Sequence, residues 1–220
     1  GGLPQLKAAI ADKMRRENNL VYQPEDIAVT VGAKHALYEI FQVLCEPGDE
    51  VVLPSPYWVS YLEQIRLAGA TPVVVPGDPA NSLKISAEDL RRALSPHTKA
   101  VLLNSPNNPT GAVYTRQELE ALAQVILDSP AWIVSDEIYE AFIYAAEPHV
   151  SIASLSPALQ ERTLIVNGFS KRYAMTGWRL GYVAGPRPVI EAITNLQSHS
   201  TSNPTSFAQA GALAALQGPA

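Results

Sequence analysis

The sequence SKRYAMTGWRLG occupies residues 170–181 and follows a short apolar run at residues 163–166, which is typical of a buried strand. Lys171 comes just beyond that strand, next to the small residue Ser170, in a position poorly suited to packing alone. Arg179 comes later in the same segment, between glycines that allow the backbone to approach a bound group. The segment therefore places an amine and a guanidinium group just beyond the end of one strand.

These two side chains suggest a particular ligand chemistry. A lysine amine forms a Schiff base with an aldehyde, and an arginine holds a phosphate through two parallel hydrogen bonds. An aldehyde and a phosphate in one small molecule describe pyridoxal phosphate. The alternative is that Lys171 and Arg179 are solvated side chains around a surface turn. The rest of the sequence has to decide between these interpretations.

The composition limits the classes of protein to consider. A chain of 220 residues that is 47% hydrophobic and 17% charged fits one globular unit with a sizeable core. The net charge of −5 argues against a general nucleic-acid surface and against an anionic membrane surface. No apolar run approaches the roughly 20 residues of a membrane span. We therefore expect neither a nucleic-acid nor a membrane partner.

The cysteine and histidine content argues against disulfide and metal chemistry. Cys45 is the only cysteine, which excludes an internal disulfide and a cysteine-based metal site. The four histidines are scattered without the spacing of metal ligands: His35, His97, His149 and His199. No metal site is expected, and the cytoplasm is the predicted compartment.

Strands and helices alternate along the chain. Strands are predicted at residues 27–31, 51–53, 71–75, 99–103, 132–134, 163–166 and 182–184. Helices are predicted at residues 5–18, 33–45, 57–68, 86–94, 115–128, 188–198 and 205–216, the fourth and fifth capped by Ser86 and Thr115. Residues 145–159 show little periodicity and are predicted as loop with short turns.

This alternation predicts an α/β fold, a three-layer α/β/α sandwich around a mostly parallel seven-stranded sheet. Crossover connections between parallel strands should be right-handed. No helix separates the strands at residues 163–166 and 182–184. The strand at residues 182–184 is therefore predicted to run antiparallel to the others.

Polar and aromatic residues with chemical potential follow the predicted strands. Open α/β sheets bind ligands beyond the carboxyl ends of their strands, and this is where the sequence places Gly32, Lys34, Trp58, Asn108, Asp136, Tyr139 and Lys171. A buried carboxylate at Asp136 could pair with a protonated pyridine nitrogen, which makes the ring an electron sink. Tyr139 and Asn108 could donate to a ring oxygen, and Trp58 could stack on the ring.

Each of these residues also has a purely structural interpretation. Asp136 could cap the turn that follows it, and Trp58 could belong to the core. Asn108 could only shape its loop, Tyr139 could only pack, and Lys34 could be a solvated helix residue. Their shared placement at one edge of the sheet favours the functional interpretation.

Three motifs make the sequence resemble the class I aminotransferases, which are pyridoxal-phosphate enzymes of fold type I. They are NSPNNPTG at residues 104–111, SDEIY at 135–139 and the segment at 170–181. The resemblance covers essentially the whole chain. The sequences VTVGAK at residues 29–34 and SPYWVSY at 55–61 point to the subgroup of bacterial aspartate and aspartate/prephenate aminotransferases.

The resemblance implies a role for each candidate residue. Lys171 would form the Schiff base and move the substrate proton, and Asp136 would pair with the ring nitrogen. The other implied cofactor contacts are Trp58 on the ring face, Asn108 and Tyr139 at the ring oxygen, and Gly32, Ala33, Lys34, Ser170 and Arg179 around the phosphate. Lys34, Trp58 and Asn108 would also contact the substrate. Gly168 departs from the family pattern, because many relatives have serine there.

The resemblance also implies an incomplete unit and a reaction. Residues 1–220 would form the large cofactor-binding domain, with an N-terminal arm and a small C-terminal domain outside them, in a homodimer. The implied reaction is ping-pong transamination between an amino acid, aspartate or glutamate, and a 2-oxo acid. A pyridoxal-phosphate-dependent β-eliminating lyase and the effector-binding domain of a transcription regulator remain the alternatives.

Overall fold

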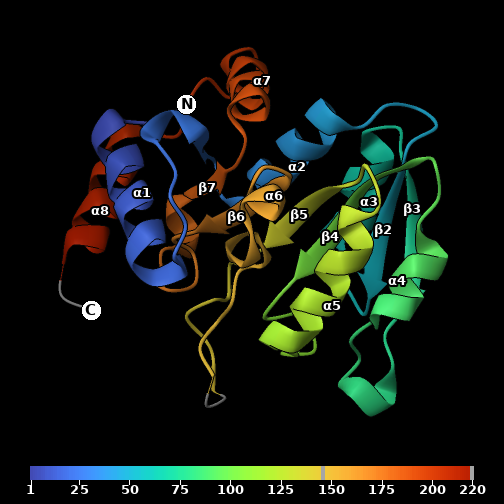
Figure 1. Ribbon diagram of the computed structural model, residues 1–220. Coiled ribbons are helices and arrows are strands. Elements are labelled where there is room, and N and C mark those ends of the chain that lie inside the picture. Colours follow the sequence, from blue (N-terminus) through green and yellow to red (C-terminus); the bar gives the residue numbers. More distant parts are fainter. Residues whose placement is uncertain (145–146, 219–220) are drawn as a thin grey trace.

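The computed structural model describes residues 1–144 and 147–218. Seven strands form one sheet: β1 (Ile27–Thr30), β2 (Glu50–Ser55), β3 (Thr71–Pro76), β4 (Thr98–Asn104), β5 (Trp132–Asp136), β6 (Thr163–Gly168) and β7 (Gly181–Ala184). The α-helices are α1 (Pro4–Asn18), α2 (Ala33–Leu44), α3 (Ser60–Leu67), α4 (Ala87–Ala93), α5 (Arg116–Leu127), α6 (Pro157–Gln160), α7 (Arg187–Ser198) and α8 (Ser206–Gln217). Figure 1 shows their arrangement.

The strand order across the sheet is β1-β7-β6-β5-β4-β2-β3. The neighbouring pairs from β6 to β3 are parallel, whereas β7 is antiparallel to both β6 and β1. The prediction that residues 182–184 run antiparallel is therefore confirmed. The physical reason is the short connection after β6, which returns the chain without a helical crossover.

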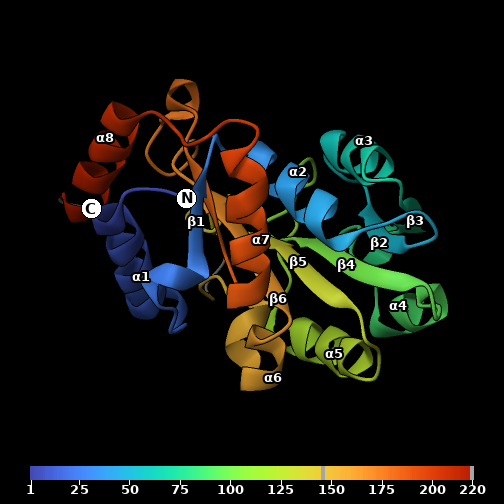
Figure 2. The same cartoon turned by 90° about the horizontal axis from the view of Figure 1, so that it is seen from above.

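Helices cover both faces of the sheet, as Figure 2 shows from above. Helices α2, α3 and α7 pack on one face. Helices α4, α5 and α6 cover the opposite face, and α1 and α8 extend that layer over β1 and β7. Alternate residues of a strand point to opposite faces: in β1, Ala28 joins the first layer, and Ile27 and Val29 join the second. The three-layer α/β/α prediction is confirmed.

The register of the sheet brings the polar strand ends together. Asn104 at the end of β4 lies opposite Asp136 at the end of β5, and Asp136 lies opposite Val166 in β6. Lys171 follows β6 within a few residues. Because these strands are parallel, all three polar residues lie at the same edge of the sheet.

Most element boundaries agree with the sequence, including both predicted caps. The side chain of Ser86 accepts a hydrogen bond from the Asp89 amide, and that of Thr115 accepts one from the Glu118 amide. The unpatterned region at 145–159 contains a 3₁₀ turn at Ile152–Leu155 and the single-turn α6, while residues 145 and 146 lie outside the described residues.

The helix expected at residues 57–68 was predicted to start too early. It begins at Ser60, and residues 57–59 connect it to β2. The apolar content of these three residues imitates a helix turn, but Tyr57 and Trp58 pack against the core beside the sheet edge instead. Tertiary packing therefore decided this boundary over local pattern.

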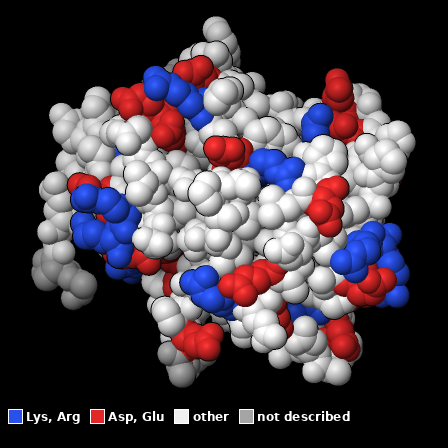
Figure 3. Space-filling view, viewed as in Figure 1, with Lys and Arg blue, Asp and Glu red and all other residues white. Residues whose placement is uncertain are grey.

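Charged side chains of both signs alternate over the face drawn in Figure 3. On α4, Arg91 pairs with Glu88 at 2.7 Å and Arg92 with Asp89 at 2.6 Å. Such exposed pairs contribute little to stability. In the part of the chain that the structure describes, no helix is long and apolar enough to cross a membrane.

Candidate active site

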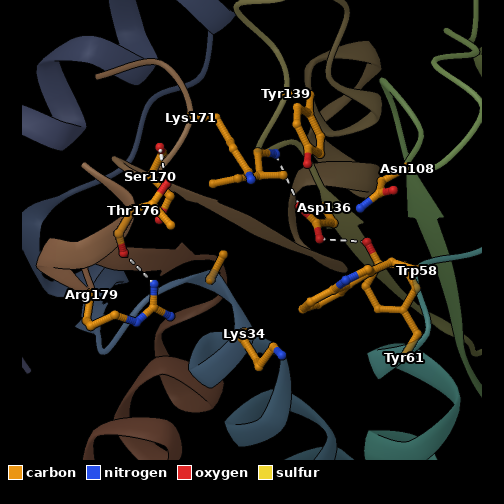
Figure 4. A pocket seen from close by; sticks show the side chains of 12 residues that line it. Lys34, Trp58, Tyr61, Asn108, Asp136, Tyr139, Ser170, Lys171, Thr176 and Arg179 are labelled. Carbon is orange, nitrogen blue, oxygen red and sulfur yellow. Dashed lines mark hydrogen bonds between the residues drawn. The ribbon is translucent and has the colours of Figure 1, made fainter. Parts of the chain in front are cut away.

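A cavity of about 270 Å³ lies at the carboxyl edge of the sheet. Figure 4 shows the side chains around it. Its lining contains nine of the residues predicted from the sequence: Ala33, Lys34, Trp58, Asn108, Asp136, Tyr139, Ser170, Lys171 and Arg179. Gly32, the remaining candidate, is the residue before Ala33 and lies against Arg179. One cavity therefore collects residues that follow five different strands.

Asp136 forms the buried carboxylate of the cavity, with 3% of its surface exposed. Its Oδ2 accepts a hydrogen bond from the Tyr61 hydroxyl at 2.7 Å, and its Oδ1 accepts one from the Ile138 amide at 3.1 Å. Burial raises the pKa of Asp136 to about 6, against the opposing effect of these two hydrogen bonds. Asp136 thus caps the following turn, as its structural interpretation expected, and still presents a carboxylate to the cavity.

Asn104 fixes the loop that carries Asn108. Its side-chain amide donates to the carbonyl oxygen of Asp136 at 2.9 Å, and its Oδ1 accepts from the backbone amide of Asn108 at 2.8 Å. Asn104 therefore ties two strand ends together and leaves the Asn108 side chain facing the cavity (Figure 4).

Trp58 and Lys34 form the wall opposite Tyr139. The Lys34 amine lies 4.8 Å from the centre of the Trp58 ring, a cation–π distance. The Trp58 ring meets the Tyr61 ring edge to face, with centroids 5.4 Å apart. Trp58 also packs against the core, as its structural interpretation expected, and its side chain lines the cavity. These contacts hold a flat aromatic surface at the edge of the cavity.

The Lys171 amine lies 5.4 Å from the centre of the Tyr139 ring. Among the described residues, this amine has no hydrogen-bond acceptor and no ion-pair partner. A lysine that faces a cavity without a partner is available for reaction with a ligand. Figure 4 shows the side chains of Lys171 and Tyr139 directed toward the cavity.

The side of the cavity formed by the N-terminus of α2 and by Arg179 suits an anion. The first amides of α2, at Ala33 and Lys34, have no acceptor among residues 1–144 and 147–218, and a helix N-terminus favours negative charge. Arg179 lies beside them, fixed by a 2.8 Å hydrogen bond to the carbonyl of Thr176. A Cβ at Gly32 would lie 2.5 Å from the Arg179 guanidinium, so only glycine allows this approach.

The glycine at position 168, which departs from the serine expected from the family resemblance, is explained by packing. A Cβ on Gly168 would come within 2.9 Å of the Leu180 carbonyl oxygen and 3.0 Å of the Gly181 Cα. A side chain there would force β7 away from β6, because backbone atoms cannot turn aside as a flexible side chain can. Gly168 therefore contributes no side chain to the cavity, whereas Ser170, Thr176 and Arg179 line it.

Three further lining residues were not predicted as site residues: Tyr61, Ile138 and Thr176. Tyr61 lies three residues beyond Trp58, a spacing that would place both side chains on one side of the helix predicted at residues 57–68. That spacing was the available signal for Tyr61. Thr176 lies within the segment at residues 170–181, but nothing in its sequence context separates it from its neighbours.

A second cluster lies outside the cavity. His149, Glu137 and Glu140 have potential ligand atoms within 4.8 Å of one another, although their spacing in sequence gave no sign of it. Glu137 accepts hydrogen bonds from Ser135 and Ser151 and pairs with His149 at 2.9 Å. Burial lowers the pKa of His149, but the charge of Glu137 outweighs burial and raises it. Glu140 pairs with Lys13. The two carboxylates are thus engaged by other side chains, whereas the buried Nδ1 of His149 has no hydrogen-bond partner among the described residues.

Comparison with known proteins shows similarity along the whole chain. The family model for "Aminotransferase class I and II" matches residues 1–220. The aspartate aminotransferase of Geobacillus stearothermophilus is 57% identical over 219 residues, covering 100% of this chain and 56% of that protein. The aspartate/prephenate aminotransferase of Cereibacter sphaeroides is 48% identical, covering 99% of this chain and 55% of that protein.

Solved structures show the same fold. The aspartate aminotransferase of Rhizobium meliloti superposes with a TM-score of 0.97 at 44% identity, over 99% of this chain and 55% of that chain. The Thermus thermophilus aspartate aminotransferase with maleate gives 0.94 at 48% identity, over 98% and 55%. The chain thus spans little more than half the length of these relatives. With its sequence matched from end to end and its fold reproduced, this chain belongs to the class I and II aminotransferase family.

Proposed function

We propose that this chain is the large cofactor-binding domain of a pyridoxal-phosphate-dependent aminotransferase that transfers the amino group of aspartate or glutamate to a 2-oxo acid. Class I and II aminotransferases use pyridoxal phosphate. The observation that carries the proposal is the unpartnered Lys171 amine in the same cavity as the buried Asp136 carboxylate. An amine for the aldehyde and a carboxylate for the ring nitrogen are the two groups this chemistry requires.

The lining residues fit the parts of the cofactor. Ser170, Arg179 and the free amides of α2 would hold the phosphate. Trp58 would cover the ring face, and Asn108 and Tyr139 would donate to the ring oxygen. When bound, the cofactor supplies an electron sink that stabilises negative charge at the substrate α-carbon.

The residues of the chain would then each perform one task. The Lys171 amine would hold the aldehyde covalently and, once a substrate amine displaces it, would accept the proton of the substrate α-carbon at Nζ. Asp136 would stay ionised opposite the ring nitrogen, because a neighbouring positive charge favours the carboxylate over the acid. Trp58 would exclude water from one side of the reacting atoms.

Lys34 is our candidate for recognition of an acidic side chain. Its amine lies 4.8 Å from the centre of the Trp58 ring at the cavity wall, away from Lys171 (Figure 4). We expect Lys34→Met to raise KM for aspartate by about tenfold, the size expected for one lost charge-assisted hydrogen bond, and to change KM for a neutral amino acid less than twofold. Steady-state kinetics with both donors would measure this. Equal losses for both donors would contradict a role in side-chain recognition.

The rest of the enzyme is proposed on the family resemblance. A small domain outside residues 1–220 would carry the arginine that binds the substrate α-carboxylate, and an N-terminal arm would precede Gly1. The complete enzyme would be a cytoplasmic homodimer. Sedimentation of the full-length protein would test the dimer.

The decisive experiment is an amino-transfer assay of the full-length protein with pyridoxal phosphate, aspartate and 2-oxoglutarate. Formation of glutamate and oxaloacetate in equal amounts supports the proposal. Release of pyruvate and ammonia from a donor with a leaving group, without glutamate, would instead establish a β-eliminating lyase. A protein that binds the cofactor but catalyses neither reaction would favour the effector-binding alternative.

Tyr61→Phe tests the hydrogen bond to Asp136. This bond lowers the pKa of the carboxyl, so its loss should raise that pKa further above about 6. A hydrogen bond to a charged group contributes about 1.5–3 kcal/mol, so we expect cofactor affinity to fall roughly tenfold at pH 6. The loss should shrink as the pH rises to 8, where the carboxyl ionises in both proteins.

Cofactor titrations between pH 5 and pH 8 would measure the effect. Tyr144→Phe is the matched control, because the Tyr144 side chain is 93% exposed. An affinity loss of the same size at every pH would show that the Tyr61 hydroxyl affects the shape of the cavity and not the ionisation of Asp136.

A further inference from the structure

No residue of helix α1 lines the cavity. Two of its side chains nevertheless make ion pairs with residues that directly follow two site residues in the chain. Lys13 pairs with Glu140, the residue after Tyr139. Glu17 pairs with Arg172, the residue after Lys171. Helix α1 is therefore joined to both segments that flank the reactive amine.

The two pairs are also joined to each other. The Lys13 amine lies 3.7 Å from Glu17 as well as against Glu140. Asn18 reinforces the first pair, accepting from Lys13 at 2.8 Å and donating to Glu140 at 2.7 Å. Glu140, Lys13, Glu17 and Arg172 thus form one continuous chain of charges, the α1 network, which runs from the segment after β5 to the segment after β6.

Burial makes this network costly to break. The side chains of Lys13 and Glu140 are only 4% and 9% exposed. If either side chain moved away, the charge of the other would remain buried without its partner. A buried charge that loses its partner is strongly destabilised. Glu17 and Arg172 are more exposed, at 32% and 29%, but Glu17 is held by a charge on each side.

Tight turns connect the network to the site. After β5, the Glu140 amide donates to the carbonyl of Glu137, and the Phe142 amide donates to that of Tyr139. After β6, the Ala174 amide donates to the carbonyl of Lys171. In such short hydrogen-bonded segments, a displaced Glu140 or Arg172 would move the neighbouring Tyr139 or Lys171.

We infer that α1 acts as a brace that sets the spacing between Tyr139 and Lys171 through the α1 network, with Lys13 and Glu17 as positioning residues. The inference rests on the proposed function, because it takes Lys171 as the group that reacts with the cofactor. The spacing is the 5.4 Å between the Lys171 amine and the Tyr139 ring. A small misplacement of a reacting group is enough to lower a rate severely.

The test uses the full-length protein and two substitutions with opposite changes of charge. Lys13→Met removes one positive charge from the network, and Glu17→Gln removes one negative charge. Arg15→Met is the control, because the Arg15–Asp12 pair on the same helix is exposed and neither residue belongs to the α1 network. The readouts are the rate at which pyridoxal phosphate forms a borohydride-reducible link to Lys171, the pH midpoint of its visible absorbance, and kcat.

A brace predicts that Lys13→Met and Glu17→Gln both slow link formation and lower kcat by about tenfold. Lys13→Arg, which keeps the charge, should recover most of the loss. A direct effect of charge predicts something else: absorbance midpoints that move in opposite directions in the two variants, with rates within twofold of the parent. That result would overturn the brace.

Two further outcomes are equally clear. If the parent protein forms no reducible link to Lys171, the proposed function itself fails, and the brace fails with it. If the parent forms the link and both variants behave like Arg15→Met, the proposed function stands and the network only stabilises the fold. Glu17→Gln keeps the test valid if Lys13→Met does not fold, because Glu17 is partly exposed.

Discussion

Replacing Lys171 with alanine is expected to abolish covalent attachment of pyridoxal phosphate and to lower kcat by at least about 10³-fold in the full-length protein. The substitution removes the group that would bind the aldehyde and the base that would take the substrate proton, and base catalysis alone contributes about 10²–10⁴-fold. The fold should be unaffected, because the amine of Lys171 has no hydrogen-bond or ion-pair partner among the described residues.

Borohydride reduction followed by peptide mass mapping would measure the attachment. The parent should carry the cofactor on the peptide that contains Lys171, and Lys171→Ala should carry none. Lys99→Ala is the matched control, because Lys99 lies at the end of β4 that is away from the cavity, where it pairs with Asp49 at 3.3 Å. Recovery of the cofactor on Lys34 in the parent would show that the wrong lysine has been assigned.

Replacing Asp136 with asparagine is expected to weaken function and to stabilise the cofactor-free protein. Asparagine cannot supply the negative charge that would pair with the ring nitrogen. The loss of one partner of a buried charge pair costs about 3–5 kcal/mol, which corresponds to about 10²–10⁴-fold in kcat/KM. The shape is retained, because asparagine can still accept from the Ile138 amide and donate to the Tyr61 hydroxyl oxygen.

The stabilisation follows from the pKa of Asp136. Its folded-state pKa of about 6 is above the ordinary aspartate value of 3.8, so the folded state binds the proton more tightly than the unfolded state. Ionisation therefore costs nothing below pH 3.8, destabilises the fold increasingly up to about pH 6, and remains a constant cost above it. Two units correspond to about 3 kcal/mol.

Thermal unfolding of the cofactor-free proteins at pH 4 and pH 7 would measure this. The Tm of Asp136→Asn relative to the parent should be several degrees higher at pH 7 than at pH 4. An Asp136→Asn protein that is less stable than the parent at pH 7 would mean that the carboxylate is stabilised by the fold. In that case burial of the Asp136 carboxylate would not lower the stability of the cofactor-free protein.

Local patterns were sufficient to predict much of this molecule. Alternating apolar runs and capped helices specify an α/β fold, since strand and helix periodicities are properties of neighbouring residues. The short connection after residues 163–166 predicted an antiparallel strand. Because parallel strands end at one edge of a sheet, the sequence also predicted that Lys171, Asp136 and Asn108 lie close together.

Local patterns failed wherever a contact joined distant parts of the chain. The start of α3 at Ser60 depended on how Trp58 packs at the sheet edge. The bond from Tyr61 to Asp136 spans 75 positions. Such partners are indistinguishable in sequence from other tyrosines and carboxylates until the fold brings them together.

What the sequence by itself determined is the set of reactive groups and the sheet edge at which they meet, because both follow from residue type and strand order. Tertiary structure alone decided how those groups are held. The ion pairs from α1 to Glu140 and Arg172 span 127 and 155 positions. Packing of α1 over the sheet buries Lys13, and a buried charge must find a partner wherever the fold places one.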